Sequence, residues 1–203
     1  MVFFLMKSKP NHESLELCDE ILQETDCVKI LGLHISSDLK WGLQVNEILK
    51  RANGRLHMLK ILKKFGLPLA DLITVYVGYI RPLTEYAAPV WHAGLTEAQS
   101  DSLERIQKRC CKIMLGPSYT TYVEALNTCN LTTLKTRREK LCETFATSLV
   151  QSEEFRHWLP PTRANQHNLN LRSGSKLSVP RWSTKRYLKS PIPYFVQLLN
   201  ATL

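Results

Sequence analysis

The sequence lacks the residue patterns on which most enzyme chemistry depends. Its 203 residues contain no Asp-Asp pair, no His-x-Asp pair for iron, and no Gly-rich phosphate loop. No Ser, His and Asp set stands out as a catalytic triad. The aspartates are isolated in segments of different type: Asp19, Asp26, Asp38, Asp71 and Asp101. We therefore predict no catalytic residue, no metal site and no small-molecule substrate.

Cysteine is present, but not in a pattern that binds zinc. The chain has no C-x-x-C pair, and no histidine lies at the spacing of a zinc finger. The six cysteines, most of them expected in the core or on helix faces, are Cys18, Cys27, Cys110, Cys111, Cys129 and Cys142. Adjacent residues point to different sides of a helix, so only one of Cys110 and Cys111 is expected to be buried.

Long hydrophobic runs are also missing. No apolar run approaches the roughly 20 residues that a helix needs to cross a bilayer. The opening MVFFLM is too short for a secretory signal and lacks its basic leader. These absences predict an intracellular protein with no membrane partner, without choosing between nucleus and cytoplasm.

Acidic residues are absent from the last quarter of the chain. No Asp or Glu follows Glu154, and the net charge of +9 is unevenly distributed. Residues 1–43 have four basic and seven acidic residues, residues 44–116 have eleven and six, and residues 117–203 have twelve and five. A chain with this distribution attracts polyanions.

Hydrophobic residues make up 44% of the chain, enough to bury a core in one domain with extensions. We predict a mainly α fold: a helical bundle with a small N-terminal β element and an irregular basic C-terminal arm. The β element covers 1–43, the bundle 44–159 and the arm 160–203. Met1–Leu5 and Val28–Ile35 are the clearest strand candidates, and Gly32 allows a kink within the second.

The clearest helix runs from Gln44 to about Lys64, where apolar residues recur every three or four positions. A polar stripe lies on its opposite side: Lys50, Asn53, His57, Lys60 and Lys64. A solvated lysine face is the ordinary explanation. However, Glu47 is the only acidic residue in the segment, so ion pairs along the helix are nearly absent. An unpaired basic stripe favours contact with phosphates.

Three more helices are expected. The second helix begins after Gly66, at Pro68, and Pro82 is expected to end or kink it. Trp91, further along the chain, is interpreted as a packing anchor. The third starts at a Thr96–Gln99 capping box and stops at Gly116. It carries a second basic face: Arg105, Lys108, Arg109 and Lys112. The fourth, Thr132 to Leu149, has cations near its start, where a bound anion would offset their repulsion by the helix dipole.

The arm combines Pro and Ser with basic and aromatic residues. Its basic residues include Arg181, Lys185 and Arg186, interleaved with Trp158, Trp182 and Tyr187. Aromatic faces beside cations suit single-stranded or bulged nucleic acid. The same aromatics could equally dock the arm onto the helical core.

Several stretches resemble one protein family. VKILGLHISSDLKW, from Val28 to Trp41, is similar to the palm-to-thumb junction in reverse transcriptases of non-LTR (LINE-type, jockey-like) retrotransposons. YIRPLTEYAAPVW resembles the family's R-x-x-L-x-Y-x-x-x-V-W, and LERIQKRCCKIMLG resembles its L-x-x-x-Q-x-x-x-x-R-x-I-x-G. The resemblance is strongest from Val28 to Gly116 and weaker beyond.

The resemblance implies a role in nucleic-acid binding. Leu31 and Gly32 would form the primer-support turn, residues 44–159 the thumb, and the basic stripes the grip on an RNA, DNA or hybrid duplex. The parent enzyme is an RNA-directed DNA polymerase that uses magnesium, but the aspartates of its palm are missing here. We therefore expect a fragment that binds nucleic acid, without cofactor or polymerase activity of its own. One alternative is a helical protein-interaction module, which a protein partner or a missing upstream polymerase domain would complete. The other alternative is a non-functional relic.

Overall fold

The fold is mainly helical with a small antiparallel β element near the N-terminus, as predicted. The structure, a computed structural model, describes residues 16–17, 20–21, 25–167, 174–179, 181 and 184–202. The predicted strand Met1–Leu5 and Cys18 lie outside these residues. Among the described residues, no helix combines the length and apolar character needed to span a membrane.

The β element contains two short hairpins. β1 (Glu16–Leu17) pairs with β2 (Glu20–Ile21), and β3 (Cys27–Ile30) pairs antiparallel with β4 (Leu33–Ser36). Leu31 and Gly32 join β3 to β4 with φ of 48° and 85°. Two consecutive positive φ angles are typical of the two-residue turns that match the twist of a hairpin. This agrees with the predicted strand pair broken at Gly32.

The first long helix is α1 (Gly42–Lys64), which begins two residues before the predicted start. It ends because Gly66 adopts a φ of +80°, which a residue with a Cβ adopts at a cost. The backbone N–H of Leu67 then donates to the carbonyl of Leu62 at 3.3 Å and closes the last turn. Gly66 therefore stops helix α1, as predicted from the sequence.

The second helical segment continues past Pro82 after an irregular turn. It consists of α2 (Leu69–Val75), the π-helical turn η1 (Tyr76–Ile80) and α3 (Arg81–Glu85). Pro82 lacks a backbone N–H, and its ring crowds the preceding turn of the helix. For this reason the helix was predicted to end or kink at Pro82. The wider π turn lies directly before it and accommodates it, so helical structure continues to Glu85.

Shorter and longer helices follow in order. They are α4 (Ala88–Trp91), η2 (His92–Gly94), α5 (Glu97–Leu115), η3 (Gly116–Ser118), α6 (Tyr122–Thr128) and α7 (Leu134–Gln151). The start of α5 has the predicted capping box, in which Thr96 and Gln99 each bond the other's backbone N–H. Trp91 is fully buried, as expected for a packing anchor. Helix α6 is not predicted from the sequence.

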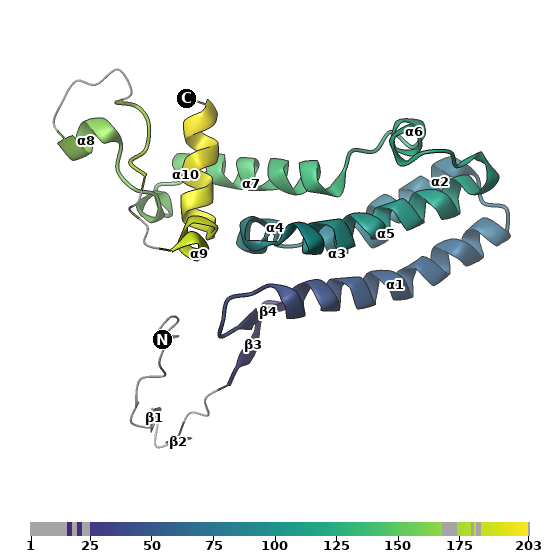
Figure 1. Ribbon diagram of the computed structural model, residues 1–203, viewed down its shortest axis with the longest axis horizontal. Coiled ribbons are helices and arrows are strands. Elements are labelled where there is room, and N and C mark those ends of the chain that lie inside the picture. Colours follow the sequence, from purple (N-terminus) through teal and green to yellow (C-terminus); the bar gives the residue numbers. More distant parts are fainter. Residues whose placement is uncertain are drawn as a thin grey trace.

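The bundle is built around α1, α5 and the segment between them. Figure 1 shows α1 and α5 side by side. The segment from α2 to α3, which lies between them in the sequence, runs back in the opposite direction. Their shared core includes Leu56, Leu59, Tyr76 and Met114. Cys110 and Cys111 are both fully buried, so the expectation that only one would be buried is wrong. Both belong to the core that α5 shares with α1 and the segment between them, and Cys111 also contacts Cys129, which follows α6.

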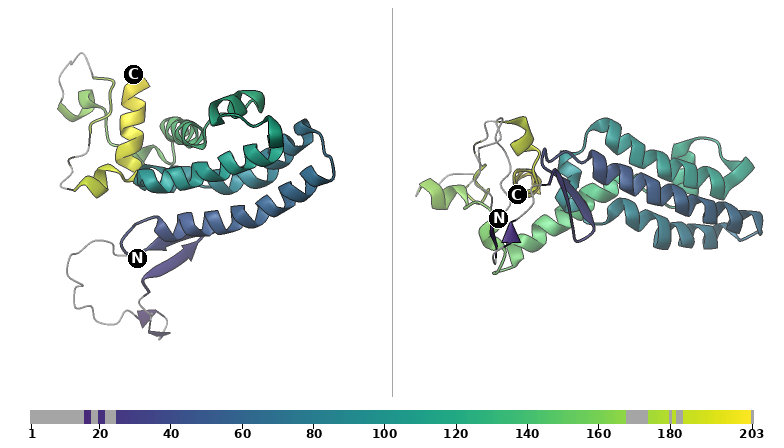
Figure 2. Two further views of the ribbon diagram at one scale, coloured as in Figure 1. Left: turned by 45° about the vertical axis from the view of Figure 1, so that its right-hand side comes forward. Right: turned by 90° about the horizontal axis from the view of Figure 1, so that it is seen from below.

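A second core lies at the far end of α7. The chain continues through η4 (Arg156–Trp158), α8 (Arg163–His167), α9 (Lys185–Leu188) and α10 (Pro191–Thr202). Helix α10 packs across α7 (Figure 2). It buries Phe195, Val196 and Leu199 against Cys142 and Leu149. The C-terminal segment thus ends in a packed helix that composition alone did not indicate.

Candidate nucleic-acid interface

The basic stripe predicted on α1 is exposed to solvent. Lys50, His57, Lys60 and Lys64 all lie on the surface, while Val45, Ala52, Leu56 and Leu59 of the opposite face are buried. This arrangement follows from the helical repeat, because residues three and four apart share a side of the helix. Lys50 and Lys64 are 14 residues apart, which corresponds to about 21 Å along the axis.

Helix α5 brings its cations beside this stripe because it runs parallel to α1. Gly42 faces Gln99 near the start of both helices, and Gly116 faces Lys63 near their ends. Between these points, the Arg109 guanidinium donates a hydrogen bond to Asn53 Oδ1 on the stripe itself. Arg105 and Lys112, both exposed, lie one turn to either side of Arg109 on α5. We call the surface formed by Lys50, His57, Lys60, Lys64, Arg105, Lys108, Arg109 and Lys112 the basic face.

Few carboxylates neutralise the basic face. On α1 the described ion pair is Arg51 with Glu47 at 2.8 Å, and it lies at the edge of the stripe. The Arg51 hydrogen bond lowers the pKa of Glu47. Asp101 is exposed one turn before Arg105, but no ion pair joins them among the described residues. The cations of the basic face are therefore free to meet phosphate groups.

Two of the lysines are held over tyrosine rings. Lys108 Nζ lies 5.0 Å from the ring centroid of Tyr122, and Lys112 Nζ lies 5.3 Å from that of Tyr119. Both tyrosines follow α5 in the chain, in η3 to α6. Such cation–π contacts orient an ammonium group without neutralising it. The position of α6 beside the basic face could not be predicted from local sequence patterns.

No protein-family model, curated protein or solved structure matches the chain. The interpretation of the basic face therefore rests on its geometry and on the residues themselves.

A buried polar network fixes α5 beneath the basic face. Gln107 is fully buried; its Nε2 donates to Tyr122 Oη at 2.9 Å and to the Thr132 carbonyl at 2.8 Å. Its Oε1 accepts from Tyr76 Oη. Burial, and then the Glu104 carboxylate that accepts from its hydroxyl, raises the pKa of Tyr122. The network connects α5 to η1, α6 and the start of α7.

The anion predicted at the start of α7 is supplied by the chain itself. The Glu104 carboxylate accepts from the backbone N–H groups of Leu134 and Lys135 at 3.2 and 3.3 Å. Arg137 forms a two-pronged pair with Glu85, at 2.5 and 3.1 Å. These carboxylates offset the repulsion between the cations and the helix dipole. The start of α7 is therefore a structural junction, in which carboxylates of the chain itself offset the repulsion that a bound anion was expected to relieve.

The predicted primer-support turn lies outside the basic face. Leu31 is 85% exposed, and its carbonyl accepts a hydrogen bond from Tyr86 Oη at 2.7 Å. The Tyr86 ring would lie 3.7 Å from a Cβ placed on Gly32. Tyr86 thus braces the turn between β3 and β4, a contact that joins residues 55 positions apart.

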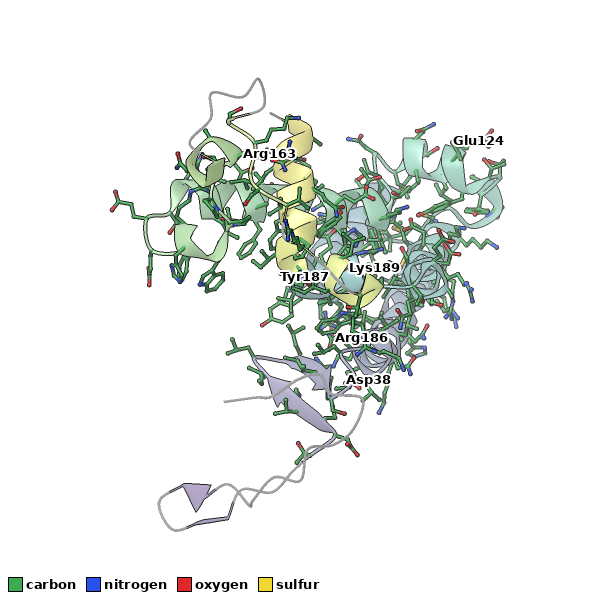
Figure 3. All side chains as sticks on the ribbon, turned by 60° about the vertical axis from the view of Figure 1, so that its left-hand side comes forward. Asp38, Glu124, Arg163, Arg186, Tyr187 and Lys189 are labelled. Carbon is green, nitrogen blue, oxygen red and sulfur yellow. The ribbon has the colours of Figure 1, made fainter. Side chains whose placement is uncertain are left out.

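The cations predicted in the C-terminal arm are also separate. Arg181 and Arg186 are exposed, and Lys185 and Arg186 belong to α9. Figure 3 shows Arg186 on this short helix and Lys189 just after it, next to α10. In Figure 1, α9 lies at the opposite end of the molecule from the end of α1. The structure therefore unites the predicted residues of α1 and α5, but not those of the arm.

The described carboxylates do not form a site for two magnesium ions. Asp26 precedes β3, Asp38 follows β4, and Asp71 and Asp101 belong to α2 and α5; Asp19 lies outside the described residues. Hydrogen bonds from Ser36 and then Lys40 lower the pKa of Asp38 to about 2, so its carboxylate braces the hairpin end. No group of three or more His, Cys, Asp or Glu in the described part of the chain could hold a metal.

Proposed function

We propose that the chain binds nucleic acid through the basic face of α1 and α5, in the manner of a polymerase thumb. The observation that carries this proposal is the parallel packing of the two helices. It places two rows of exposed cations side by side, joined by the bond between Arg109 and Asn53. Two rows can follow a phosphate backbone over about 21 Å, whereas a single row could be a solvated surface.

The resemblance to non-LTR retrotransposon reverse transcriptases supports the same proposal. Under it, the chain corresponds to the thumb and C-terminal region of an RNA-directed DNA polymerase. The ligand would be RNA, DNA or their hybrid, held through phosphates. The chemistry of polymerisation and its magnesium ions would belong to a catalytic palm and not to these residues.

The test is binding of the full chain to three labelled ligands: an RNA–DNA hybrid, a DNA duplex and a single strand, across a salt series. We expect affinity to fall steeply with salt, because phosphate contacts release counterions. Charge reversal of Lys50, Lys60 and Lys64 to Glu should weaken binding and lower the salt slope by about one for each lysine removed.

A matched control separates the basic face from net charge. Lys135, Lys140 and Lys189 are also exposed but lie on α7 and beside α9, so reversing them changes the net charge equally. We expect this control to retain most of the affinity. Equal losses in both triple variants would show that binding depends on overall charge alone. No binding at low salt would overturn the proposal.

A protein-interaction module is the second candidate function. It is favoured by apolar side chains on the β3–β4 hairpin, where Val28, Ile30 and Leu31 are 38%, 44% and 85% exposed. Apolar exposure on a short hairpin is typical of a surface covered by another protein. Association through this surface should persist or strengthen as salt rises, opposite to phosphate binding.

A further inference from the structure

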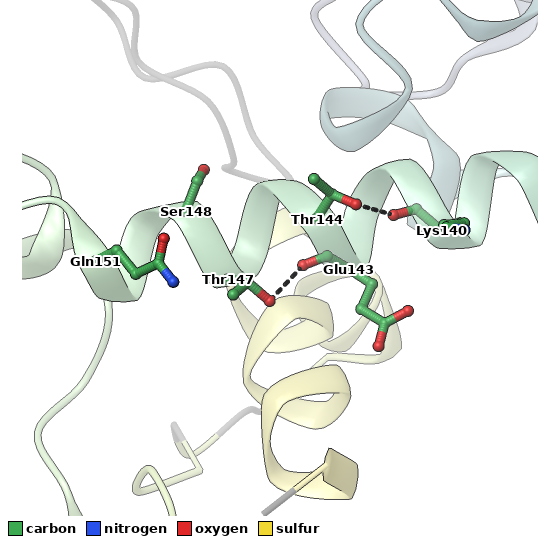
Figure 4. Close-up of a pocket in the computed structure, with 6 residues that line it drawn as sticks. All are labelled: Lys140, Glu143, Thr144, Thr147, Ser148 and Gln151. Carbon is green, nitrogen blue, oxygen red and sulfur yellow. Dashed lines mark hydrogen bonds between the residues drawn. The ribbon is translucent and has the colours of Figure 1, made fainter.

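Two hollows lie along α7, and they differ in chemistry. The first, shown in Figure 4, has a volume of about 440 Å³ and is lined by Lys140, Glu143, Thr144, Thr147, Ser148 and Gln151. The hydroxyls of Thr144 and Thr147 donate to carbonyls of α7 itself, at 2.9 and 3.0 Å. The hollow contains charges of both signs, and its hydroxyls already have partners. It therefore shows no preference for a ligand.

The second hollow contains an unsatisfied cationic group. It has a volume of about 330 Å³ and is lined by Thr147, Val150, Gln151, Arg156, Ser175, Leu177 and Leu199. The Nη1 atom of Arg156 is buried and has no hydrogen-bond partner in the part of the chain that the structure describes. Leaving a buried donor of a charged group without a partner is costly, and such groups are rare in folded proteins. Among the described residues that line it, Arg156 is the one cation and none is a carboxylate, so the charge of this part of the hollow favours an anion.

The walls of this pocket are held in place by hydrogen bonds. Asn200 of α10 accepts from the N–H of Leu177 at 2.8 Å and donates to its carbonyl at 3.1 Å. Lys176 Nζ donates to the Asn200 carbonyl at 3.0 Å, and Ser178 N–H donates to the Pro161 carbonyl at 2.9 Å. Thr147, Val150 and Gln151 share one side of α7 because they are three and four residues apart. A ligand would therefore meet a largely preformed site.

We propose that this pocket binds a small amphipathic carboxylate, with its charged end on Arg156 and its apolar body against Val150, Leu177 and Leu199. Arg binds a carboxylate through parallel N–H donors, and the Arg156 side chain that lines the pocket has an N–H group still without a partner among the described residues. A single guanidinium suits a single negative charge better than a phosphate. About 330 Å³ lies at the lower end of ligand pockets, which limits the apolar body to a short chain or a few side chains.

The same chemistry has two sources, a free carboxylic acid and the C-terminal carboxylate of an apolar peptide. Two probes distinguish them: octanoate, and the peptide Ala-Ala-Val-Leu with a free C-terminus. Octanol and the amidated peptide keep the apolar body without the charge, and acetate keeps the charge without the body. The site is separate from the basic face, so its test and that of nucleic-acid binding can fail independently.

The experiment is a titration of the isotope-labelled full chain, followed through its backbone amide signals. We expect octanoate or the free peptide to shift the signals of Val150, Gln151 and Ser175, and to bind at least tenfold more tightly than its uncharged counterpart. Arg156→Gln should weaken binding at least tenfold, and Arg156→Lys should weaken it less. Lys140→Gln, on the same helix outside this pocket, should leave affinity within twofold of the wild type.

A blocking variant keeps the test decisive if the Arg156 variants unfold. Thr147→Trp places a large side chain on an exposed lining position and leaves Arg156 in place. It should abolish the signal shifts while circular dichroism and the melting temperature stay near those of the wild type. The proposal is overturned if neither probe binds, if octanol binds as tightly as octanoate, or if folded Arg156→Gln and Thr147→Trp retain full affinity.

Discussion

The guanidinium of Arg138 is fully buried, and none of its described partners is a carboxylate within ion-pair distance. Its Nη2 donates to Ser100 Oγ at 2.9 Å, and its Nε lies 3.4 Å from His92 Nδ1. The guanidinium carbon is 5.9 Å from the centroid of the Trp91 ring, and Nη1 has no partner. Burial lowers the pKa of Arg138, as expected when a charge leaves water. The side chain joins α7 to η2 and α5 through neutral groups.

Substitution of Arg138 should separate the effect of packing from that of charge. Arg138→Ala removes a large buried side chain, and we expect the free energy of unfolding to fall by about 2–4 kcal/mol. Arg138→Met fills most of the volume without the charge, so its loss should be much smaller. Urea unfolding followed by circular dichroism measures both. Equal losses for Ala and Met would show that the guanidinium bonds, and not the volume, stabilise this junction.

His92 should make stability depend on pH. Burial, followed by the charges of Arg138 and Lys135, lowers the pKa of His92 to about 4, from an ordinary value of 6.5. Tyr194 of α10 covers its ring edge-on at 5.8 Å. In the unfolded chain the imidazole gains a proton below pH 6.5, whereas in the folded chain it resists protonation until about pH 4. Stability that is present above pH 6.5 is therefore lost as the pH falls toward 4.

The measurement is the urea midpoint at several values between pH 7 and pH 4, in the wild type and in His92→Gln. We expect the midpoint of the wild type to fall across this window and that of His92→Gln to fall less. The lowered pKa of Asp38, about 2, contributes a separate loss only below about pH 4. Identical slopes in both proteins would rule out His92 as the source.

At the scale of single elements, α7 depends on a side chain from another helix for its start. Its first backbone N–H groups bond to Thr133 Oγ1 and to the Glu104 carboxylate of α5. Glu104→Ala should lower the free energy of unfolding by about 1–3 kcal/mol, because it leaves these donors and Tyr122 Oη without their acceptor. Glu97→Ala, an exposed change on the same helix, is the control and should cost less. Urea unfolding measures both, and equal costs would contradict the capping role.

Local signals in the sequence were sufficient to predict where several elements begin and end. The Thr96–Gln99 capping box, the stops at Gly66 and Gly116 and the kink at Gly32 each depend on residues a few positions apart. Contacts between distant residues were not predictable in this way. From the sequence, Arg138 is one more cation in a basic run and Gln107 one more polar residue. Their burial depends on partners 15 or more positions away.

The same reasoning applies to the candidate site. The helical repeat predicted the exposed stripe on α1 and the basic residues of α5 separately. It could not predict that these helices run parallel and in contact, since this depends on how the segment between them returns. The cations of the arm were grouped with the others by charge alone, and the structure places them elsewhere.

At the scale of the whole molecule, the chain has distinct cores that share α7. Leu141 of α7 packs against the bundle, while Cys142, Ala146 and Leu149 pack against α10. Burial raises the pKa of Cys142 to about 12, and similarly those of Cys110 and Cys111 in the other core. Buried thiols with raised pKa values react slowly, so they report on which core opens.

Phe195→Ala should open the second core selectively. Phe195 is 2% exposed and lies 5.6 Å from the Phe145 ring, so truncation should cost about 3–5 kcal/mol locally. Alkylation by iodoacetamide at pH 8, followed residue by residue with mass spectrometry, should then be at least tenfold faster at Cys142. Cys110 and Cys111 should change little. Equal acceleration at all three thiols would show that the two cores unfold as one unit.

Helix α7 also constrains how the chain can change in length. Each residue of an α-helix turns the next by about 100°, so one residue inserted between Leu141 and Cys142 would rotate every later side chain by that angle. The face that receives α10 would then point elsewhere, although no residue had been substituted. Insertions are therefore not expected to be tolerated within α7, whose residue count sets the register between the two cores.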